Sequence, residues 1–316
     1  MATNISIGNY VSRGRLKTHP FHKSLVDYWN FKGKSNFDKD RNTIKGIKGE
    51  LLTAYNFGWS LGSGYGLFKE NYLTYRKVDN VFVTDDHSIT IMNFVPANTW
   101  ILFKYGTEHL NTTRVRVTGL TANNQLAYGY SVTNDGARVL MAIPSDGEYD
   151  LPESVVNATS YNVGFIVQNA LTKNVTIEQI PQYEGAIVTD GVDDYLKLDK
   201  VGYKVGTIII KFKPINIKPN IVNSILNIHT DEVALQYDTS GVLNNNFTTY
   251  KNYGEYSVGT FNIDKNAATP LTLGCKLSNS GRPMEYSNVA IYSVAIYQNV
   301  LTAEEIQKEI IKMQSL

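Results

Sequence analysis

Three carboxylates in the segment Glu148-Tyr149-Asp150-Leu151-Pro152-Glu153 have a spacing that could support acid–base chemistry. Side chains alternate between the two faces of a β-strand, so Glu148 and Asp150 would share one face, and glycoside hydrolysis uses two such carboxyl groups. The flanking residues favour a structural role, because Ser145-Asp146-Gly147 is a turn signal and Pro152 removes a backbone donor. We therefore expect a strand that leads into a turn, and no enzyme.

A second acidic group, Asp190, Asp193 and Asp194, surrounds Gly191. Carboxylate oxygens are the ligands that calcium prefers in proteins. The same pattern is typical of a polar turn into a strand, in which aspartate side chains accept hydrogen bonds from nearby backbone amides. We expect the structural role and no cofactor, with calcium binding as the weaker alternative.

Aromatic side chains are abundant, with 21 tyrosines, 12 phenylalanines and 3 tryptophans among 316 residues. Such a composition suits β-sheets and contact surfaces more than it suits chemistry. Residues 247–256, FTTYKNYGEY, place aromatic rings among polar residues in an expected loop or sheet edge. Phe247, Tyr250, Tyr253 and Tyr256 are therefore candidates for contact with a glycan or a protein partner, and ordinary packing is the alternative.

Charge and composition exclude several classes of partner. The net charge is +1 and no run of Lys or Arg exceeds a pair, so nothing favours nucleic acid or an anionic membrane. The sequence contains neither the apolar run of a signal peptide nor an apolar stretch long enough to span a membrane. Cys275 is the only cysteine, and its apolar surroundings indicate a buried structural thiol.

The elements that must position these residues are β-strands on both sides of a seam at residues 177–198, IEQIPQYEGAIVTDGVDDYLKL. Pro181 interrupts the alternating pattern before it and a turn follows Val188, so one β domain ends where another begins. Between residues 81 and 181 the apolar pattern has a period of two, which predicts an antiparallel sandwich. The expected strands are 88–94, 100–103, 114–117, 137–143, 163–167 and 175–177.

A second sandwich is expected over residues 184–316. Its strands are predicted at 186–188, 206–212, 225–228, 233–237, 256–261, 271–277 and 289–297. Thr302 and Glu305 form a capping box that begins one helix, and Ile306, Ile310 and Met313 lie on one face of that helix at helical spacing.

Residues 1–80 are the least regular part of the sequence. The segment 56–68, NFGWSLGSGYGLF, mixes glycines with aromatic rings that need a surface to pack on. We expect an N-terminal docking arm that wraps a neighbouring domain or subunit, or alternatively an irregular lid on the first sandwich. Its candidate contact residues are Tyr28, Trp29, Phe31, Phe57, Trp59 and Tyr65.

Two segments carry a family resemblance. The sequences AIVTDGVDDYLKL and VAIYQNVLTAEEIQKEI resemble the opening strand and the closing strand-turn-helix of laminin-G-like, concanavalin A-like jelly rolls. The resemblance covers about 130 residues, and it implies two stacked antiparallel sheets, a frequent carbohydrate-binding role and, in some members, calcium. Laminarinase-type glycoside hydrolases share this fold and carry carboxylates at the spacing E-x-D-x-x-E, which Glu148, Asp150 and Glu153 also have. Here, however, these three residues fall in the first sandwich and not in the segment that resembles the jelly roll.

A broader resemblance covers most of the chain. The segments LVDYWNFKGKSNFDKDRNTIKG, LTAYNF, SGYG, YDLPE and VTIEQIPQYEGAIVTDGVDDY resemble segments of structural proteins of crAss-like tailed phages that infect Bacteroidetes. This resemblance implies a virion component, namely a head or tail fibre, a collar or a decoration protein, assembled in the reducing cytoplasm of the host.

The sequence thus predicts an all-β chain of two antiparallel sandwiches in series, the second a laminin-G-like jelly roll with a C-terminal helix. The expected function is that of a non-enzymatic virion protein, a homo-oligomer attached to other virion proteins by residues 1–80, with host surface polysaccharide as a further partner. A stand-alone lectin module is the alternative, and a glycoside hydrolase is a more remote one.

Overall fold

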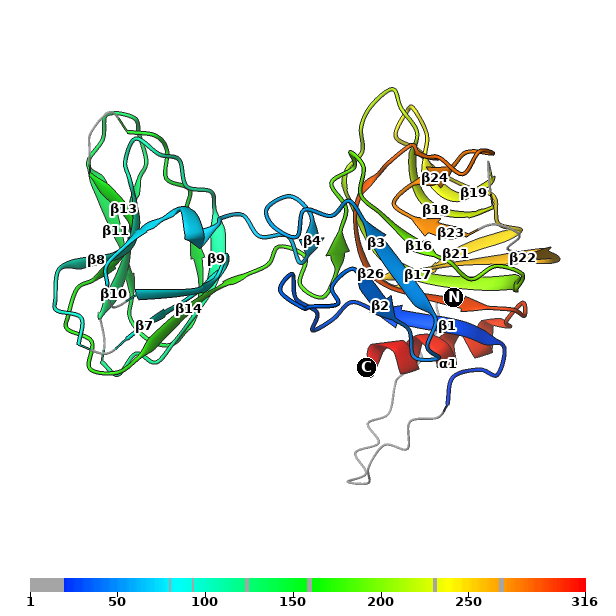
Figure 1. Cartoon of the computed structure of the whole chain (residues 1–316), viewed down its shortest axis with the longest axis horizontal. Helices are drawn as coiled ribbons and strands as arrows, with labels where there is room; N and C mark the ends of the chain where they lie inside the picture. Colours follow the sequence, from blue (N-terminus) through cyan, green and yellow to red (C-terminus); the bar gives the residue numbers. More distant parts are fainter. Residues whose placement is uncertain are drawn as a thin grey trace, which may run out of the picture.

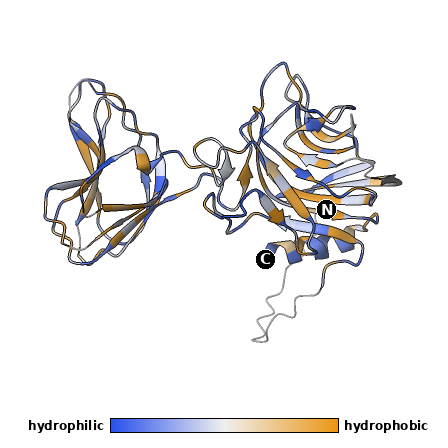
Figure 2. Cartoon of the chain, viewed as in Figure 1, coloured by the Kyte–Doolittle hydropathy of each residue, from blue (hydrophilic) through white to orange (hydrophobic). Residues whose placement is uncertain are grey.

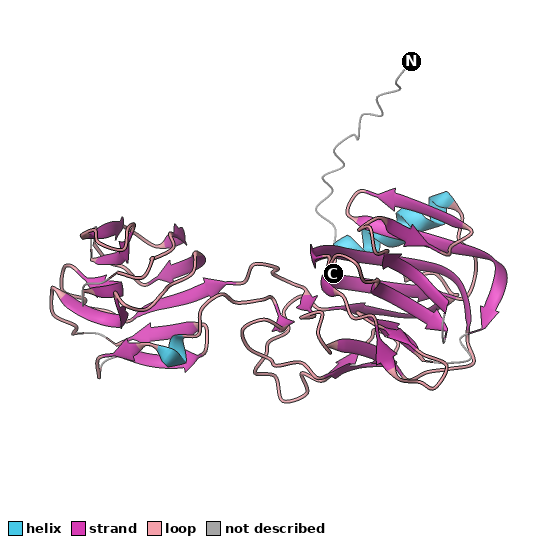
Figure 3. Cartoon of the chain, turned by 90° about the horizontal axis from the view of Figure 1, so that it is seen from above, coloured by secondary structure: helices cyan, strands magenta, loops and turns pink. Residues whose placement is uncertain are grey.

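The computed structural model describes residues 20–79, 81–92, 94–122, 125–157, 161–229, 232–266 and 270–316. The chain is all-β, with antiparallel sheets arranged as two sandwiches and one helix near the C-terminus (Figures 1 and 3). Among these residues, no helix is long and apolar enough to cross a membrane. Residues 1–19, which include the start of the predicted arm, lie outside the described residues.

The small sandwich forms the left lobe of Figure 1. One of its sheets has the order β11 (Arg138–Ile143), β10 (Leu126–Ser131), β13 (Asn162–Val167), β8 (Thr99–Tyr105) and β5 (Arg76–Lys77). The other has the order β12 (Gly147–Leu151), β9 (Thr113–Thr118), β14 (Val175–Ile180), β7 (Ser88–Ile91) and β6 (Val81–Asp85). A short 3-10 helix, η1 (Tyr72–Thr74), precedes β5.

The strands predicted between residues 81 and 181 are present. In β9 the side chains alternate strictly between buried and exposed, which is the pattern that predicted it. Alternate residues such as Val115, Val117 and Ile177 meet between the two sheets and form one core. Asn93, in the expected strand 88–94, lies outside the described residues, and β7 ends at Ile91.

The large sandwich contains strands from both ends of the chain. Its first sheet has the order β21 (Thr249–Tyr253), β22 (Tyr256–Asn266), β17 (Lys204–Asn216), β26 (Asn288–Tyr297), β15 (Ile187–Val188) and β4 (Gly64–Tyr65), with β1 (Leu25–Asn30) also paired to β26. Its second sheet has the order β2 (Thr43–Lys45), β3 (Leu51–Tyr55), β16 (Tyr195–Leu198), β23 (Leu271–Leu273), β18 (Asn223–His229), β19 (Glu232–Tyr237) and β20 (Leu243–Asn245). A separate two-stranded ribbon joins β24 (Lys276–Leu277) and β25 (Pro283–Met284).

The expected irregular arm is wrong for residues 25–65, which form β1 to β4 of the large sandwich. β1 pairs with β26, where Tyr28 lies opposite Ala295, and β3 pairs with β16, where Leu52 lies opposite Leu198. Every residue of β1 except the last is buried. Its sequence therefore lacks the alternation of apolar and polar residues that marks a half-exposed strand. The remainder of the predicted arm, residues 66–79, crosses to the small sandwich and supplies it with η1 and β5.

The small sandwich is therefore inserted between β4 and β15, which pair with each other at Tyr65 and Ile187. The two connecting segments continue this pairing: Gly66 N donates to Ala186 O at 2.9 Å, and Tyr183 N donates to Gly66 O at 2.8 Å. Gly66 has φ +88°, and a Cβ there would lie 2.5 Å from Cβ of Pro181, so only glycine fits. Two hydrogen-bonded segments, and not one flexible linker, join the lobes.

Apolar residues are concentrated in the strands of both lobes, and the loops are largely polar (Figure 2). The core of the large sandwich lies between its sheets and includes Trp29, Leu52, Ile208 and Ile291, each fully buried. A second apolar cluster lies between the outer face of the first sheet and α1 (Ala303–Gln314). The helix was predicted correctly, with a capping box at Thr302 and Glu305.

Helix α1 is anchored by a buried carboxylate as well as by its apolar face. Glu309 is 2% exposed, and its Oε2 accepts hydrogen bonds from Tyr297 Oη at 2.9 Å and His22 N at 3.0 Å. Glu309→Ala should lower the free energy of unfolding by about 2 kcal/mol, because it leaves a buried hydroxyl and an amide without an acceptor. Chemical denaturation of the full chain measures this. Glu304→Ala, an exposed change on the same helix, should have almost no effect, and equal effects of the two would contradict the anchoring role.

Cys275 is buried as predicted. Burial raises the pKa of its thiol to about 12. The thiol therefore stays protonated at pH 8, and a thiol reagent should label the native chain only as fast as the site opens. Labelling with a chromogenic disulfide should be slow in buffer and stoichiometric within the mixing time in guanidinium. Rapid labelling of the native chain would contradict this placement.

Candidate functional site

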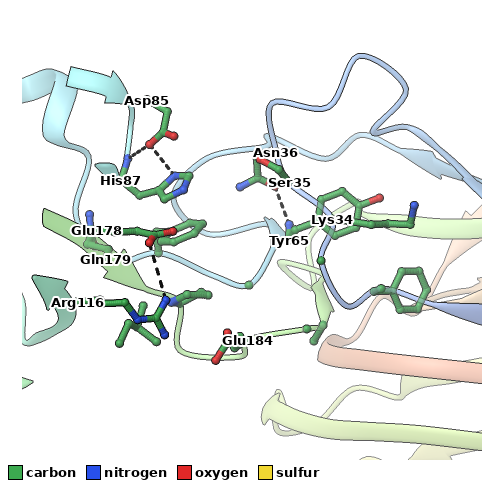
Figure 4. A pocket seen from close by; sticks show the side chains of 18 residues that line it. Lys34, Ser35, Asn36, Tyr65, Asp85, His87, Arg116, Glu178, Gln179 and Glu184 are labelled. Carbon is green, nitrogen blue, oxygen red and sulfur yellow. Dashed lines mark hydrogen bonds and ion pairs between the residues drawn. The ribbon is translucent and has the colours of Figure 1, made fainter. Parts of the chain in front are cut away.

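A cleft with a volume of about 410 Å³ lies at the junction of the two sandwiches (Figure 4). The large sandwich contributes the loop after β1 and the strand β4. The small sandwich contributes the β6–β7 turn, β9 and β14. Polar or charged residues that line the cleft are Lys34, Ser35, Asn36, Tyr65, Asp85, His87, Arg116, Glu178, Gln179 and Glu184.

His87 lies in the β6–β7 turn at the wall formed by the small sandwich. Its Nδ1 lies 2.9 Å from Asp86 Oδ1 and 3.1 Å from Asp85 Oδ1, and its ring stacks on Phe68 with centroids 4.0 Å apart. These three side chains could place ligand atoms around a metal ion. Nδ1 contacts both carboxylates, and these contacts hold the turn together.

Asn36 and Tyr65 shape the wall formed by the large sandwich. Asn36 is buried, and its Oδ1 accepts from Tyr65 N at 2.7 Å, which fixes the loop after β1 against β4. The Tyr65 hydroxyl donates to Arg41 O at 3.0 Å, and burial raises the pKa of that hydroxyl well above its usual value. Tyr65 therefore acts as a neutral hydrogen-bonding group that positions the loop.

Arg116 and the carboxylates around it give the cleft its charge. Arg116 donates to Glu148 Oε1 at 2.9 Å and lies 3.9 Å from Glu178 Oε2, and the bond to Glu148 raises the pKa of its guanidinium. With Lys34 and Glu184 nearby, both signs of charge line one cleft. Such a surface can bind a polar solute or a peptide by hydrogen bonds.

Of the residues that line this cleft, only Phe31 and Tyr65 were candidates drawn from the sequence, and they were predicted as contacts with a partner. The cleft exists because residues 25–65 fold onto a domain that begins more than a hundred residues later, and no local pattern encodes that pairing. The one available signal was the polar, proline-containing seam that includes Glu178 and Glu184.

The aromatic residues predicted to contact a partner through the N-terminal arm are packed inside the chain. Tyr28, Trp29 and Phe31 are at most 1% exposed, and Phe57 and Tyr65 are also buried. Trp59 is partly exposed and packs on Phe57 and Tyr65, with ring centroids 5.1 and 5.3 Å apart. Tyr28 packs in the cluster beneath α1 and the other five rings pack in or against the core between the two sheets, and this packing corrects their assignment as a docking surface.

The second aromatic group lies on the hairpin of β21 and β22 and, for Phe247, just before β21. Phe247 and Tyr250 stack on each other with centroids 6.1 Å apart, and both pack against the core of the large sandwich. Tyr253 and Tyr256 pack instead in the cluster beneath α1. The four rings thus face two different sides of the sheet, so they do not form one binding platform.

Glu148 and Asp150 lie on β12, an edge strand, on its exposed face. Glu148 pairs with Arg114 at 3.0 Å, and Asp150 lies 3.7 Å from the same arginine. Between them, Tyr149 points toward the core of the small sandwich. The two carboxylates form part of an ion-pair ladder across β9 and β12.

Asp190, Asp193 and Asp194 lie together in the turn between β15 and β16, and one carboxylate oxygen of each is within 4.8 Å of the others. Asp190 Oδ1 accepts from Val192 N at 2.7 Å, as expected for a polar turn. Burial, with a contribution from the charge of Asp190, raises the pKa of Asp194 to about 6.

Comparison with known proteins identifies no relative. No protein-family model matches the chain, and no significant match is found among curated proteins or solved structures.

Proposed function

We propose that the chain is a non-enzymatic structural protein of a phage virion, in which the large sandwich attaches to other virion proteins and the small sandwich projects. The observation that carries this proposal is the paired connection between the lobes. The small sandwich is inserted into a strand pair of the large one and held by hydrogen bonds from Gly66 and Tyr183, so it stands away from the body on a stiff joint.

The resemblance of the sequence to structural proteins of Bacteroidetes-infecting tailed phages supports the virion assignment. The surface position and ion pairing of Glu148 and Asp150 support a role without catalysis, because both carboxylates are exposed on an edge strand and held by arginine. We further propose that the large sandwich is a laminin-G-like jelly roll. The opening and closing segments that resemble this family lie side by side as β15 and β26, with Ile187 opposite Ile291.

The test is the protein content of purified phage particles. We expect the chain to be present at a fixed copy number by mass spectrometry of particles from the phage that encodes it. Antibodies against the small sandwich should label intact particles at one substructure by immunogold electron microscopy. Absence of the chain from purified particles, with its presence in the lysate, would overturn the proposal.

A glycan-binding role is the second candidate, and a groove beside α1 favours it. The groove has a volume of about 520 Å³ and is lined by tyrosines and charged side chains, among them Tyr256, Tyr292, Lys211 and Glu255. Lys211 Nζ lies 5.0 Å from the centroid of the Tyr292 ring and 2.7 Å from Glu255 Oε2. Aromatic faces beside charged hydrogen-bonding groups suit sugars.

Glycan-array binding of the full chain tests this second candidate. Tyr292→Ala should abolish a signal that depends on the groove. Tyr161→Ala, which changes an exposed tyrosine of the small sandwich, should preserve it. No binding by the unmodified chain to any array component would remove the glycan candidate and leave the virion proposal intact.

A further inference from the structure

Strand β11 is the outermost strand of its sheet, and among the described residues it pairs only with β10. All of its residues, from Arg138 to Ile143, pair with β10 in an unbroken register. Alternate residues of a strand direct their backbone N–H and C=O groups to opposite sides, so half of these groups point away from β10. No backbone group elsewhere in the described part of the chain donates to them or accepts from them. The free edge of β11 is therefore a row of backbone donors and acceptors.

The side chains of β11 are apolar after its first residue. Val139 and Leu140 are 38% and 41% exposed, although both lie near the middle of the strand. Met141 packs against the core on the inner face of the sheet. Leu140 lies on the outer face opposite Gly129, where a Cβ on that glycine would lie 3.2 Å from Leu140 Cδ2. An exposed edge that is apolar on both faces is a surface to which another β-strand can add.

The other edges of the two sandwiches are protected against such addition. In the small sandwich, β12 carries the carboxylates of Glu148 and Asp150, β5 consists of two cationic residues, and β6 has an irregular register after Val83. In the large sandwich, edge strands β2, β4 and β20 have at most three residues, and β21 has a lysine at its centre. Charges, short strands and bulges keep edges from pairing, and β11 has none of these between its end residues.

The one charged side chain of β11 is turned away from the free edge. Arg138 Cζ lies 4.6 Å from the centroid of the Trp100 ring, which belongs to β8 in the interior of the sheet. Arg138 Nη1 also donates to Asn162 O, on β13, at 3.4 Å. The guanidinium therefore lies over the sheet and leaves the edge open. Figure 1 shows that the sheet of β10, β11 and β13 lies on the side of the small sandwich remote from the large one.

The chemistry of this edge favours a second copy of the same strand. In an antiparallel pair about a two-fold axis, residues equally far from the axis oppose one another, with their side chains on the same face. Leu140 on the axis would oppose its own copy. Val139 would then oppose Met141 of the second copy, and Arg138 would oppose Ala142 of the second copy. The two arginines would lie about 13 Å apart along the pair, so no like charges meet.

We propose that two copies of the chain join through β11, in an antiparallel pair with Leu140 on the two-fold axis. The two five-stranded sheets become one continuous sheet, and the free backbone groups of both edges gain partners. The exposed parts of Val139 and Leu140 are buried in the same step. This dimer depends on the small sandwich and not on residues 1–80, and it forms whether or not the chain belongs to a virion.

Sedimentation velocity of the purified full chain tests the dimer. One short strand pair is a small interface, so the mass should rise from that of one chain to that of two between about 1 and about 200 µM protein. Leu140→Lys places two cations opposite each other on the axis and should keep the chain monomeric over the same range. Phe82→Lys changes an exposed residue on edge strand β6 and should leave the dimer intact. Circular dichroism checks that both variants are folded.

Disulfide cross-linking tests the register. Opposed residues of an antiparallel pair have Cα atoms about 4.5–5.5 Å apart, a distance that a disulfide spans. Leu140→Cys should therefore give a covalent dimer on mild oxidation. Ala142→Cys should give none, because each new thiol would lie more than about 13 Å from its own copy. The native Cys275 is buried and does not interfere.

Three results would overturn the proposed dimer. The first is an unmodified chain that stays monomeric at about 200 µM, which would leave the edge to a strand of another protein. The second is a dimer that survives Leu140→Lys. The third is a dimer that Ala142→Cys cross-links and Leu140→Cys does not.

Discussion

Trp29→Ala should lower the free energy of unfolding of the large sandwich by roughly 3–5 kcal/mol, the cost of removing the largest side chain from a closed core. Trp29 is fully buried on β1, within the core formed by both sheets, and its Nε1 donates to Glu50 O at 3.0 Å. The truncation leaves a cavity and a carbonyl without its donor. Guanidinium denaturation, followed by a signal from the large sandwich, measures the loss.

A matched pair on β3 provides the control. Leu52 is fully buried and its neighbour Leu51 is 46% exposed. Leu52→Ala should therefore lower the free energy of unfolding by about 2–5 kcal/mol, and Leu51→Ala should lower it by less than about 1 kcal/mol. If Trp29→Ala and Leu52→Ala both left the stability unchanged, residues 25–55 would be a detachable arm after all.

The contrast between the two ends of the chain shows what the sequence can encode locally. Strand β9 and helix α1 were predictable because each has one buried face and one exposed face. This produces the alternation of Thr113–Thr118 and the helical spacing of Ile306, Ile310 and Met313. The capping box at Thr302 added a signal that depends only on neighbouring residues.

Strand β1 was not predictable for the opposite reason. Its residues are buried on both faces, and its partner β26 lies more than 260 residues away in the sequence. An apolar segment with no alternation fits an interior strand and a docking segment equally well. The aromatic residues were recognised correctly as needing a surface to pack on, and that surface is the core of the same chain.

The candidate sites also differ in whether neighbouring residues or distant segments of the sequence create them. The clustering of Asp190, Asp193 and Asp194 could be predicted because the three residues share one turn. The complete burial of Asp194 could not, since it depends on segments distant in the sequence, such as the one that contains Ser63. The junction cleft depends entirely on such distant segments, and no spacing of Arg116 and His87 along the sequence indicates that they line one wall.

Asp27→Ala should lower the free energy of unfolding by about 3 kcal/mol. This is nearly as much as the loss of a large core side chain, although the change removes only a carboxylate. Asp27 is fully buried on β1. Its Oδ1 accepts from Tyr28 N at 2.7 Å and Lys48 N at 2.8 Å, and its Oδ2 accepts from Glu50 N at 2.7 Å. The change leaves three amides without an acceptor, and each unsatisfied buried group costs on the order of 1–3 kcal/mol.

The same carboxylate determines the loop that connects β2 to β3. A Cβ at Gly46 would lie 2.3 Å from Asp27 Cγ, so Gly46→Ala should displace the carboxylate and reproduce much of the loss. Gly58→Ala is the matched control, because a Cβ there would meet its nearest neighbour, Ser63 Oγ, at an ordinary 3.5 Å. Chemical denaturation of the unmodified chain and of the three variants measures these effects. The free energy of unfolding should fall strongly for Asp27→Ala and Gly46→Ala and should hardly change for Gly58→Ala. Equal stability of Asp27→Ala and the unmodified chain would mean that β1 does not hold this loop, and the place of residues 25–55 in the large sandwich would have to be abandoned.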